Sequence, residues 1–186
     1  MTRLCDEIKI HYSSKWGNIP LVKRWNEGPI AQLPFDFCIL EFAPTNVRHM
    51  WTYATCCMSQ PSDAALLKIH LFSPIQCELH VELLTVIAHY HCTGQTLALG
   101  HTVNFGRPWL HGSTCGYGLI ALPYLDGPEI EDIRLQGRHL TVKCCWLIPI
   151  TESERNYKRI HGLETLEFKF NESKFDYLDP YPRSVV

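Results

Sequence analysis

The stretch "HLTVKCCWLIPITESERNYKRIHG", residues 139–162, passes from one structural pattern to another within a few positions. Its first half is rich in aliphatic and aromatic residues, and almost every residue from Cys144 to Ile150 is apolar. A run of this kind is typical of a central β-strand that is covered on both faces. The first half therefore predicts a strand in the middle of a sheet.

The second half of the stretch begins with the signals of a helix. Thr151 is a suitable N-cap, and Glu154 stands three residues later, which together form the pattern of a capping box. Glu154 and Lys158 are spaced for an ion pair on one helix face, and Gly162 stands where a helix would end. We therefore expect a helix over residues 152–161 directly after the strand.

The segments before this stretch add strands and one long helix. Alternating apolar positions predict strands in three neighbouring segments, of which the first and third are expected to present one face to the core. Because their connections are short, these three favour an antiparallel meander, and a further strand is expected at 117–125. The three segments are "FDFCILEFA" (35–43), "HMWTYATCCMS" (49–59) and "DAALLKIHLFSP" (63–74).

The segment "PIQCELHVELLTVIAHYH", residues 74–91, has the spacing of an amphipathic helix. One face of this helix is expected to pack on the sheet. That face comprises Ile75, Leu79, Leu83, Val86, Ile87 and Tyr90.

The chain ends in segments with weaker patterns. "LETLEFKF", which follows Gly162, predicts another short helix, and "DYLDPYPRSVV" with its two prolines predicts a tail with a fixed path. "DGPEIEDIRLQGR", between the last two strands, begins with a turn and predicts one short helix.

Length and composition indicate one α+β domain, with a mixed, largely antiparallel sheet flanked by helices. The chain has 186 residues, of which 46% are hydrophobic, enough for one continuous core. Its two expected parts are residues 1–34, an N-terminal segment with a short helix that packs on the domain, and the domain itself, residues 35–186. The formal charge is only −2, so a nucleic-acid partner is not expected. The sequence shows neither a signal peptide nor an apolar run long enough to span a membrane, and a cytoplasmic location is expected.

The nine cysteines do not form a recognisable framework. Their number is odd and most lie in strand-like runs, so we expect reduced, buried thiols. Adjacent strand residues point to opposite faces, so neither "CC" pair is expected to act as a pair of metal ligands. No metal and no cofactor are predicted.

The glycine-rich stretch "LALGHTVNFGRPWLHGSTCGYG", residues 97–118, has two interpretations. In the first, it is a long structured loop that presents a protein-binding surface, and no catalytic residue is predicted. In the second, the loop 101–115 is the site of a small hydrolase or a metal-binding protein that uses His101, His111 and Cys115. Convergence of these three side chains in a pocket would separate the two.

Five segments, in order, resemble the Suppressor of fused-like domain, in the form of a stand-alone bacterial member. The first three are "TYATCCMS", a helix ending "LLTVIAHYH", and "LGHTV". The last two are "CWLIPITESERNYKRIHGLETLEFKF" and the C-terminal "DYLDPYPRSVV".

The resemblance implies an α+β fold and a role in binding proteins. In animal members a second domain follows, and the two domains hold a short extended segment of a transcription factor. A stand-alone bacterial member resembles an immunity protein, which neutralises a partner toxin. Tyr90 matches the helix-end tyrosine that contacts the partner peptide in the two-domain members, and Gly100 matches their loop glycine. The aspartate that follows this glycine in those members is missing: either His101 stands in its place or the loop is one residue shorter here.

The expected partner is therefore another protein, possibly a cognate toxin, and both a monomer and a homodimer remain open. Asn104 and the aromatic and basic side chains of the loop are of the types found in interfaces, although Phe105 and Trp109 alternatively cover the sheet edge. The predicted partner-binding residues are Tyr90, Gly100, His101, Asn104, Phe105, Arg107 and Trp109. An acidic cluster that would suit a basic toxin, with a solvated loop as the alternative, comprises Asp126, Glu129, Glu131 and Asp132.

Overall fold

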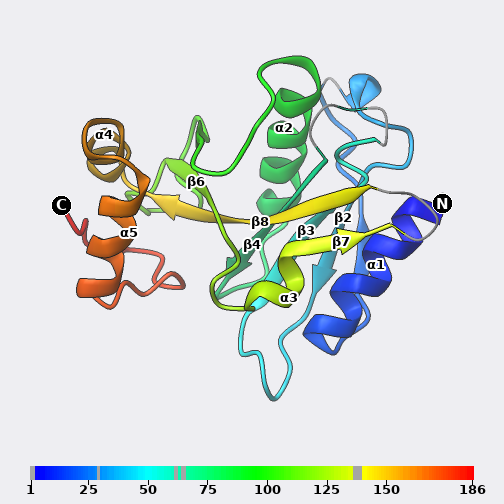
Figure 1. Cartoon of the computed structure of the whole chain (residues 1–186), viewed down its shortest axis with the longest axis horizontal. Helices are drawn as coiled ribbons and strands as arrows, with labels where there is room; N and C mark the ends of the chain where they lie inside the picture. The colour runs from blue at the N-terminus through cyan, green and yellow to red at the C-terminus, as the bar shows by residue number, and fades with distance from the viewer. Residues whose placement is uncertain (1–2, 29, 61–62, 64–65, 136–139) are drawn as a thin grey trace.

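A computed structural model describes residues 3–28, 30–60, 63, 66–135 and 140–186. One sheet runs through these residues in the order β1-β2-β3-β4-β8-β6-β5, and β7 pairs with β8 beside this path (Figure 1). Only β4 and β8 are parallel, so the predicted α+β fold with a mixed, largely antiparallel sheet is confirmed. The strands are β1 (Leu21–Lys23), β2 (Cys38–Phe42), β3 (Trp51–Cys56), β4 (Leu67–Ser73), β5 (Thr102–Asn104), β6 (Tyr117–Ala121), β7 (Asp132–Arg134) and β8 (Thr141–Ile150).

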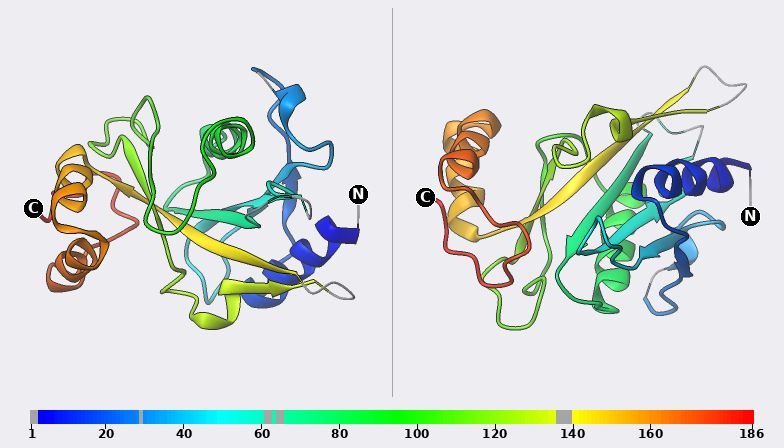
Figure 2. Two further views of the ribbon diagram at one scale, coloured as in Figure 1. Left: turned by 45° about the horizontal axis from the view of Figure 1, so that its top comes forward. Right: turned by 90° about the horizontal axis from the view of Figure 1, so that it is seen from below.

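Helices cover both faces of the sheet. Figure 2 shows α2 on one side and α1 and α3 on the other, with α4 and α5 gathered at the far end of β8. The helices are α1 (Arg3–Trp16), α2 (Leu79–Thr93), α3 (Pro128–Glu131), α4 (Glu152–His161) and α5 (Leu163–Glu172), and a 3₁₀ turn, η1, spans Ile30–Gln32. None of the described helices is both long and apolar enough to cross a membrane.

The strand and helix predicted at 139–162 are present as β8 and α4. Residues 144–150 are all buried, and the side chains alternate between the two faces. The Thr151 hydroxyl accepts a hydrogen bond from the Glu154 amide, while the Glu154 carboxylate accepts one from the Thr151 amide at 2.7 Å. The capping box is thus confirmed, but the ion pair between Glu154 and Lys158 is not formed. Instead, Lys158 donates to the Gly100 carbonyl, and Glu154 binds the C-terminal tail.

The meander β2-β3-β4 is confirmed, but β2 and β4 are buried on both faces. The alternation predicted one polar face, yet Lys68 and His70 are fully buried. The physical reason is that α1, which the sequence predicts only as a short helix, lies over this second face. Its buried side chains are Cys5, Ile8, Tyr12 and Trp16.

The helix predicted at 74–91 begins later, at Leu79, and packs with a different face. Leu83 and Ile87 are buried as expected, whereas the other four predicted positions are roughly half exposed. Two polar residues, His80 and His91, face the core instead because they have hydrogen-bond partners there. The exposed positions are Ile75, Leu79, Val86 and Tyr90.

The prediction that all nine cysteines are reduced is wrong for two of them. Cys5 of α1 and Cys57, which follows β3, form a disulfide. Cys144 and Cys145 point to opposite faces as expected, but Cys56 and Cys57 do not, because the strand ends at Cys56 and Cys57 has a positive φ of 58°.

The predicted helix after Gly162 is confirmed as α5, and the predicted short helix before β8 as α3, although β7 was not expected. The C-terminal tail has no helix or strand and is tied to α4: the Val185 amide donates to Glu154 at 3.1 Å.

Candidate functional site

Tyr90 lies in the last turns of α2, and the other predicted site residues surround strand β5, which lies at one edge of the sheet. The Phe105 amide donates to the Gly116 carbonyl and the Ile120 amide donates to the His101 carbonyl, each at 2.9 Å. The backbone N–H and C=O groups of the odd-numbered residues in this segment therefore point toward β6. By alternation, the N–H and C=O groups of Thr102 and Asn104 point away from it. Edge groups of this kind can pair with another strand.

Gly100 positions the start of β5. Its φ is 78°, a conformation that favours glycine, and a β-carbon at this position would lie 3.4 Å from Leu163 of α5. Its amide donates to Ile120, and its carbonyl accepts a hydrogen bond from Lys158 of α4. Gly100 is buried, so it contributes backbone geometry to the site and no exposed contact surface.

Phe105 and Asn104 shape the turn after β5. The Asn104 side chain is exposed and its Oδ1 atom accepts the Gly106 amide at 2.8 Å, which closes a tight turn. Phe105 is partly buried and lies on Gly118 of β6, where an added β-carbon would be 2.6 Å from the phenyl ring. Gly118 is thus required by this close packing.

Trp109 lies in the core, only 3% exposed. Its ring stacks on His80 of α2 with 5.7 Å between the centroids, and its indole N–H donates to the Ser113 hydroxyl at 3.0 Å. Of the two interpretations of Trp109, the structure favours the one in which it covers the sheet. The prediction that Trp109 contacts a partner is therefore wrong, and Trp109 instead fixes the loop against α2.

Arg107 also ties the loop to α2. It donates to the Glu82 carboxylate at 2.6 Å and to the Leu79 carbonyl at 3.2 Å. Tyr90 and His101 are the remaining predicted residues, and both are exposed. The predicted set thus divides into Tyr90, His101 and Asn104 on the surface and Gly100, Phe105, Arg107 and Trp109 as scaffold.

The acidic cluster does not form a free negative patch. Asp126 is buried and paired with Arg48. Glu129 is paired with Lys15 at 2.6 Å, and Lys143 lies 3.1 Å from Glu131 and 2.8 Å from Asp132. All four carboxylates have cationic partners, so the predicted acidic patch is wrong, whereas Glu129, with a side chain 79% exposed, is solvated as the alternative expected.

The catalytic alternative requires His101, His111 and Cys115 to converge, and they do not. The two histidines are exposed, whereas the Cys115 side chain is fully buried and burial raises its thiol pKa to about 11. A thiol in this state is a poor nucleophile and a poor metal ligand. Among the described residues, the one group of three potential ligand side chains within 4.8 Å of each other is Cys5, Cys56 and Cys57, which includes the disulfide.

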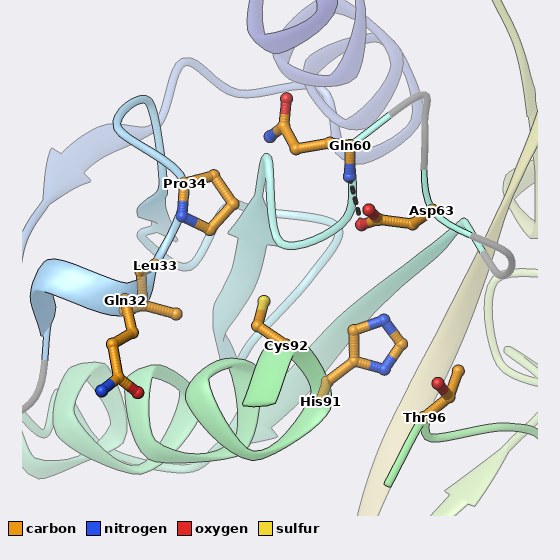
Figure 3. Close-up of a pocket in the computed structure, with 8 residues that line it drawn as sticks. All are labelled: Gln32, Leu33, Pro34, Gln60, Asp63, His91, Cys92 and Thr96. Carbon is orange, nitrogen blue, oxygen red and sulfur yellow. Dashed lines mark hydrogen bonds between the residues drawn. The ribbon is translucent and has the colours of Figure 1, made fainter. Parts of the chain in front are cut away.

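A cavity of about 410 Å³ opens beside the end of α2 (Figure 3). His91 on its wall uses both ring nitrogens for structure: Nδ1 accepts the Leu97 amide at 3.0 Å, and Nε2 lies 3.1 Å from the Ser59 hydroxyl. The neighbouring Cys92 donates to the Met58 carbonyl, and burial raises its thiol pKa. Among the described residues that line the cavity, neither His91 nor Cys92 is thus an activated nucleophile. Its lining residues are Gln32, Leu33, Pro34, Gln60, Asp63, His91, Cys92 and Thr96.

Comparisons with known proteins agree with this architecture. A putative Suppressor of fused homologue from Neisseria gonorrhoeae FA 1090 is 30% identical, with a TM-score of 0.86 over 98% of this chain and 97% of the other. The Sufu–Fu complex structure matches with 15% identity and a TM-score of 0.67, covering 98% of this chain and 92% of that chain.

Suppressor of fused from Drosophila matches with 17% identity and a TM-score of 0.59, and the match covers 96% of this chain but 50% of the Drosophila chain. No curated protein matches the sequence significantly. The sequence model of the Suppressor of fused protein (SUFU) family matches residues 34–181 of this chain. The chain therefore belongs to the Suppressor of fused family.

Proposed function

We propose that this chain is a non-enzymatic protein-binding domain that pairs edge strand β5 with an extended segment of a partner protein. The observation that carries the proposal is the register of β5, which directs the backbone groups of Thr102 and Asn104 away from β6. Backbone hydrogen bonds to an edge strand provide affinity, and nearby side chains provide specificity. Here the exposed neighbours on the same segment are His101 and Asn104.

The opposite edge of the sheet is less suited to this role. β1 carries Lys23, whose ammonium lies 3.8 Å from the Glu41 carboxylate, and charged lysines are a common means of protecting an edge strand. β5 has the sequence Thr-Val-Asn, without a charge. The difference favours β5 as the edge that accepts a partner.

A protein partner is further supported by the related structure that was solved as the Sufu–Fu complex. The more specific idea of an immunity protein came from the resemblance to stand-alone bacterial members, and an acidic surface would have helped such a protein to attract a basic toxin. Since those four carboxylates are paired with cations of the same chain, the charge argument no longer supports a toxin. We therefore propose a protein partner without assigning it to the toxin class.

The proposal can be tested by placing the photo-crosslinking residue p-benzoylphenylalanine at position 104 in the chain expressed in its native cells. We expect a discrete crosslinked partner, identified by mass spectrometry, whose yield falls at least tenfold when Thr102→Pro removes one outward N–H. Because that N–H does not bond β6, the substitution leaves the existing ladder intact.

Two controls make the result interpretable. Thr102→Ser retains the backbone N–H and should keep the crosslink. Val47 is 89% exposed and lies between β2 and β3, far from β5 in the sheet order, so the same photo-residue at position 47 should not give this adduct. A crosslink that survives Thr102→Pro, in a variant with unchanged thermal unfolding, would contradict pairing at β5.

A further inference from the structure

The disulfide between Cys5 and Cys57 joins α1 to the end of β3 across 52 residues of sequence. Both side chains are fully buried beneath α1, in the cluster formed by α1, β2, β3 and β8. This bond is thus the covalent attachment of the N-terminal helix to the sheet.

A third sulfur lies within reach of the disulfide. The Sγ atoms of Cys5, Cys56 and Cys57 all lie within 4.8 Å of each other, because the positive φ of Cys57 turns its side chain to the same side as that of Cys56. The Cys56 thiol also donates to the Cys5 carbonyl at 3.6 Å. A thiol at this distance needs only a small displacement to attack a disulfide.

The surroundings of Cys56 keep it in the thiol form. Its direct cross-strand partner Cys38, together with burial, raises the pKa of the Cys56 thiol. The buried Lys68 ammonium, which donates to the Ser59 carbonyl at 3.1 Å, offsets only part of this effect. Exchange therefore rests on the short distance between the sulfurs and requires Cys56 to lose its proton during the step.

The other described attachments of α1 are noncovalent. Its side chains Ile8, Tyr12 and Trp16 pack on the sheet, His11 Nε2 lies 3.1 Å from the Ile130 carbonyl, and Lys15 pairs with Glu129 on the surface. The buried Trp16 indole N–H finds no hydrogen-bond partner among the described residues, which costs free energy when α1 docks. The disulfide adds a covalent link to this packing.

We propose that Cys5, Cys56 and Cys57 form a thiol–disulfide latch in which Cys5 can be bonded to either neighbour, and whose reduction by a dithiol releases α1 from the sheet. This latch is independent of the proposed binding at β5.

The exchange step is balanced without an external oxidant. The Cys56 sulfur forms a bond to Cys5 as Cys56 loses its proton, the Cys5–Cys57 bond breaks, and the leaving Cys57 sulfur takes up a proton, so that one thiol and one disulfide are present before and after. Opening the latch requires a dithiol such as reduced dithiothreitol, which is oxidised to its disulfide while Cys5 and Cys57 each gain one electron and one proton.

The exchange is tested by disulfide mapping with mass spectrometry after acid quenching. In the full-length Cys57→Ser variant, we expect mild oxidation to form the Cys5–Cys56 bond. In the unsubstituted protein under limiting dithiothreitol, both Cys5–Cys57 and Cys5–Cys56 peptides should appear, which provides a readout if the variant does not fold. Cys5 found only as a thiol in the folded variant, or only Cys5–Cys57 in the parent, would overturn the exchange.

The release of α1 is tested by hydrogen exchange. Full reduction should increase amide exchange in residues 4–16 at least tenfold and leave α4 unchanged, and Cys92→Ser, which removes an exposed thiol outside the cluster, should respond as the parent does. Equal exchange in the oxidised and reduced proteins would overturn the latch. A zinc measurement can also overturn the latch. If the reduced protein retains one equivalent of zinc and the Cys56→Ser variant does not, the sulfurs are metal ligands.

Discussion

Two buried polar networks differ in how completely their atoms are paired. The C-terminal network comprises Thr151, Glu154 and the tail residues Ser184 and Val185. The N-terminal network comprises Arg48, Asp126 and His70, with Tyr12 and Trp16 of α1 packed against the His70 ring.

In the C-terminal network, both oxygens of the Glu154 carboxylate are used. One accepts the Thr151 amide and hydroxyl at 2.7 and 2.9 Å, and the other accepts the Val185 amide at 3.1 Å. The Ser184 hydroxyl lies 2.8 Å from that of Ser153 and joins the tail to the same cap. The final residues of the chain thus complete a network that the capping box begins.

In the N-terminal network, one ion pair is packed among aromatic rings. Arg48 pairs with Asp126 and lies over the Trp16 and Phe72 rings at 5.3 and 5.1 Å. His70 Nε2 is 3.9 Å from Asp126, beyond hydrogen-bond distance, and neither ring nitrogen has a partner within the described part of the chain. The comparison indicates that hydrogen bonds secure α4 and the tail, whereas ring packing, one ion pair and a disulfide secure α1.

Removing Asp126 should give the largest effect. Asp126→Ala leaves the largely buried Arg48 guanidinium without its counter-charge, and we expect a loss of about 3–5 kcal/mol in the free energy of unfolding, measured in urea. Glu129→Ala, at a carboxylate that is 79% exposed, should change stability by less than about 0.5 kcal/mol. A loss below about 1 kcal/mol for Asp126→Ala would show that solvent or a rearranged partner compensates Arg48.

Glu154→Ala should have the next largest effect. It leaves the Thr151 and Val185 amides without acceptors in a buried setting, so we expect a loss of about 2–4 kcal/mol and increased amide exchange in the tail. The matched control is Glu152→Ala on the exposed side of the same helix turn. If both variants unfold at the same urea concentration, the C-terminal network does not secure the tail.

Acid should weaken the protein through its buried histidines. Burial lowers the pKa of His70 to about 3 and that of His80 to about 4. The unfolded chain therefore binds more protons than the folded chain below pH 6.5, and stability falls as pH decreases from 6.5 toward 4. Between pH 7 and pH 5 each histidine should cost about 2 kcal/mol.

The pH prediction is checked by urea unfolding at a series of pH values. His70→Leu should remove about half of the contribution from these two residues, and a variant with the same pH dependence as the parent would show that His70 is already charged or solvated. Glu152 is exposed and pairs with Arg155 of its own helix, so Glu152→Ala should leave the pH dependence unchanged.

Local sequence predicted the parts of the fold whose signals lie close together in the chain. The β8–α4 unit, the meander and α5 were correct because a strand run, a capping box or an alternation is decided by residues a few positions apart. The five segments that resemble the family are also local stretches of this kind. The predicted packing face of α2 was wrong because apolar periodicity does not reveal that His80 and His91 have partners elsewhere in the chain, Ser73 of β4 and Ser59 after β3.

The sequence did not reveal which of the candidate site residues are exposed. His101 and Asn104 are exposed, whereas Trp109, chosen on the same grounds, is enclosed by the core. That the exposed residues contact a partner stays a prediction. The aromatic character of the loop residues suggested that they contact a partner. In the folded protein, however, Trp109 fills the space between the loop and α2 and packs on His80.

The sequence by itself determined the fold class, the β8–α4 unit and the family of this protein, since these depend on local backbone preferences and on the order of apolar segments. Only the tertiary structure decided which strand is an edge, which carboxylates are paired and which cysteines meet. Those properties depend on residues far apart in the chain, such as Cys5 with Cys57 and Arg48 with Asp126, whose distances are set by how the sheet is assembled.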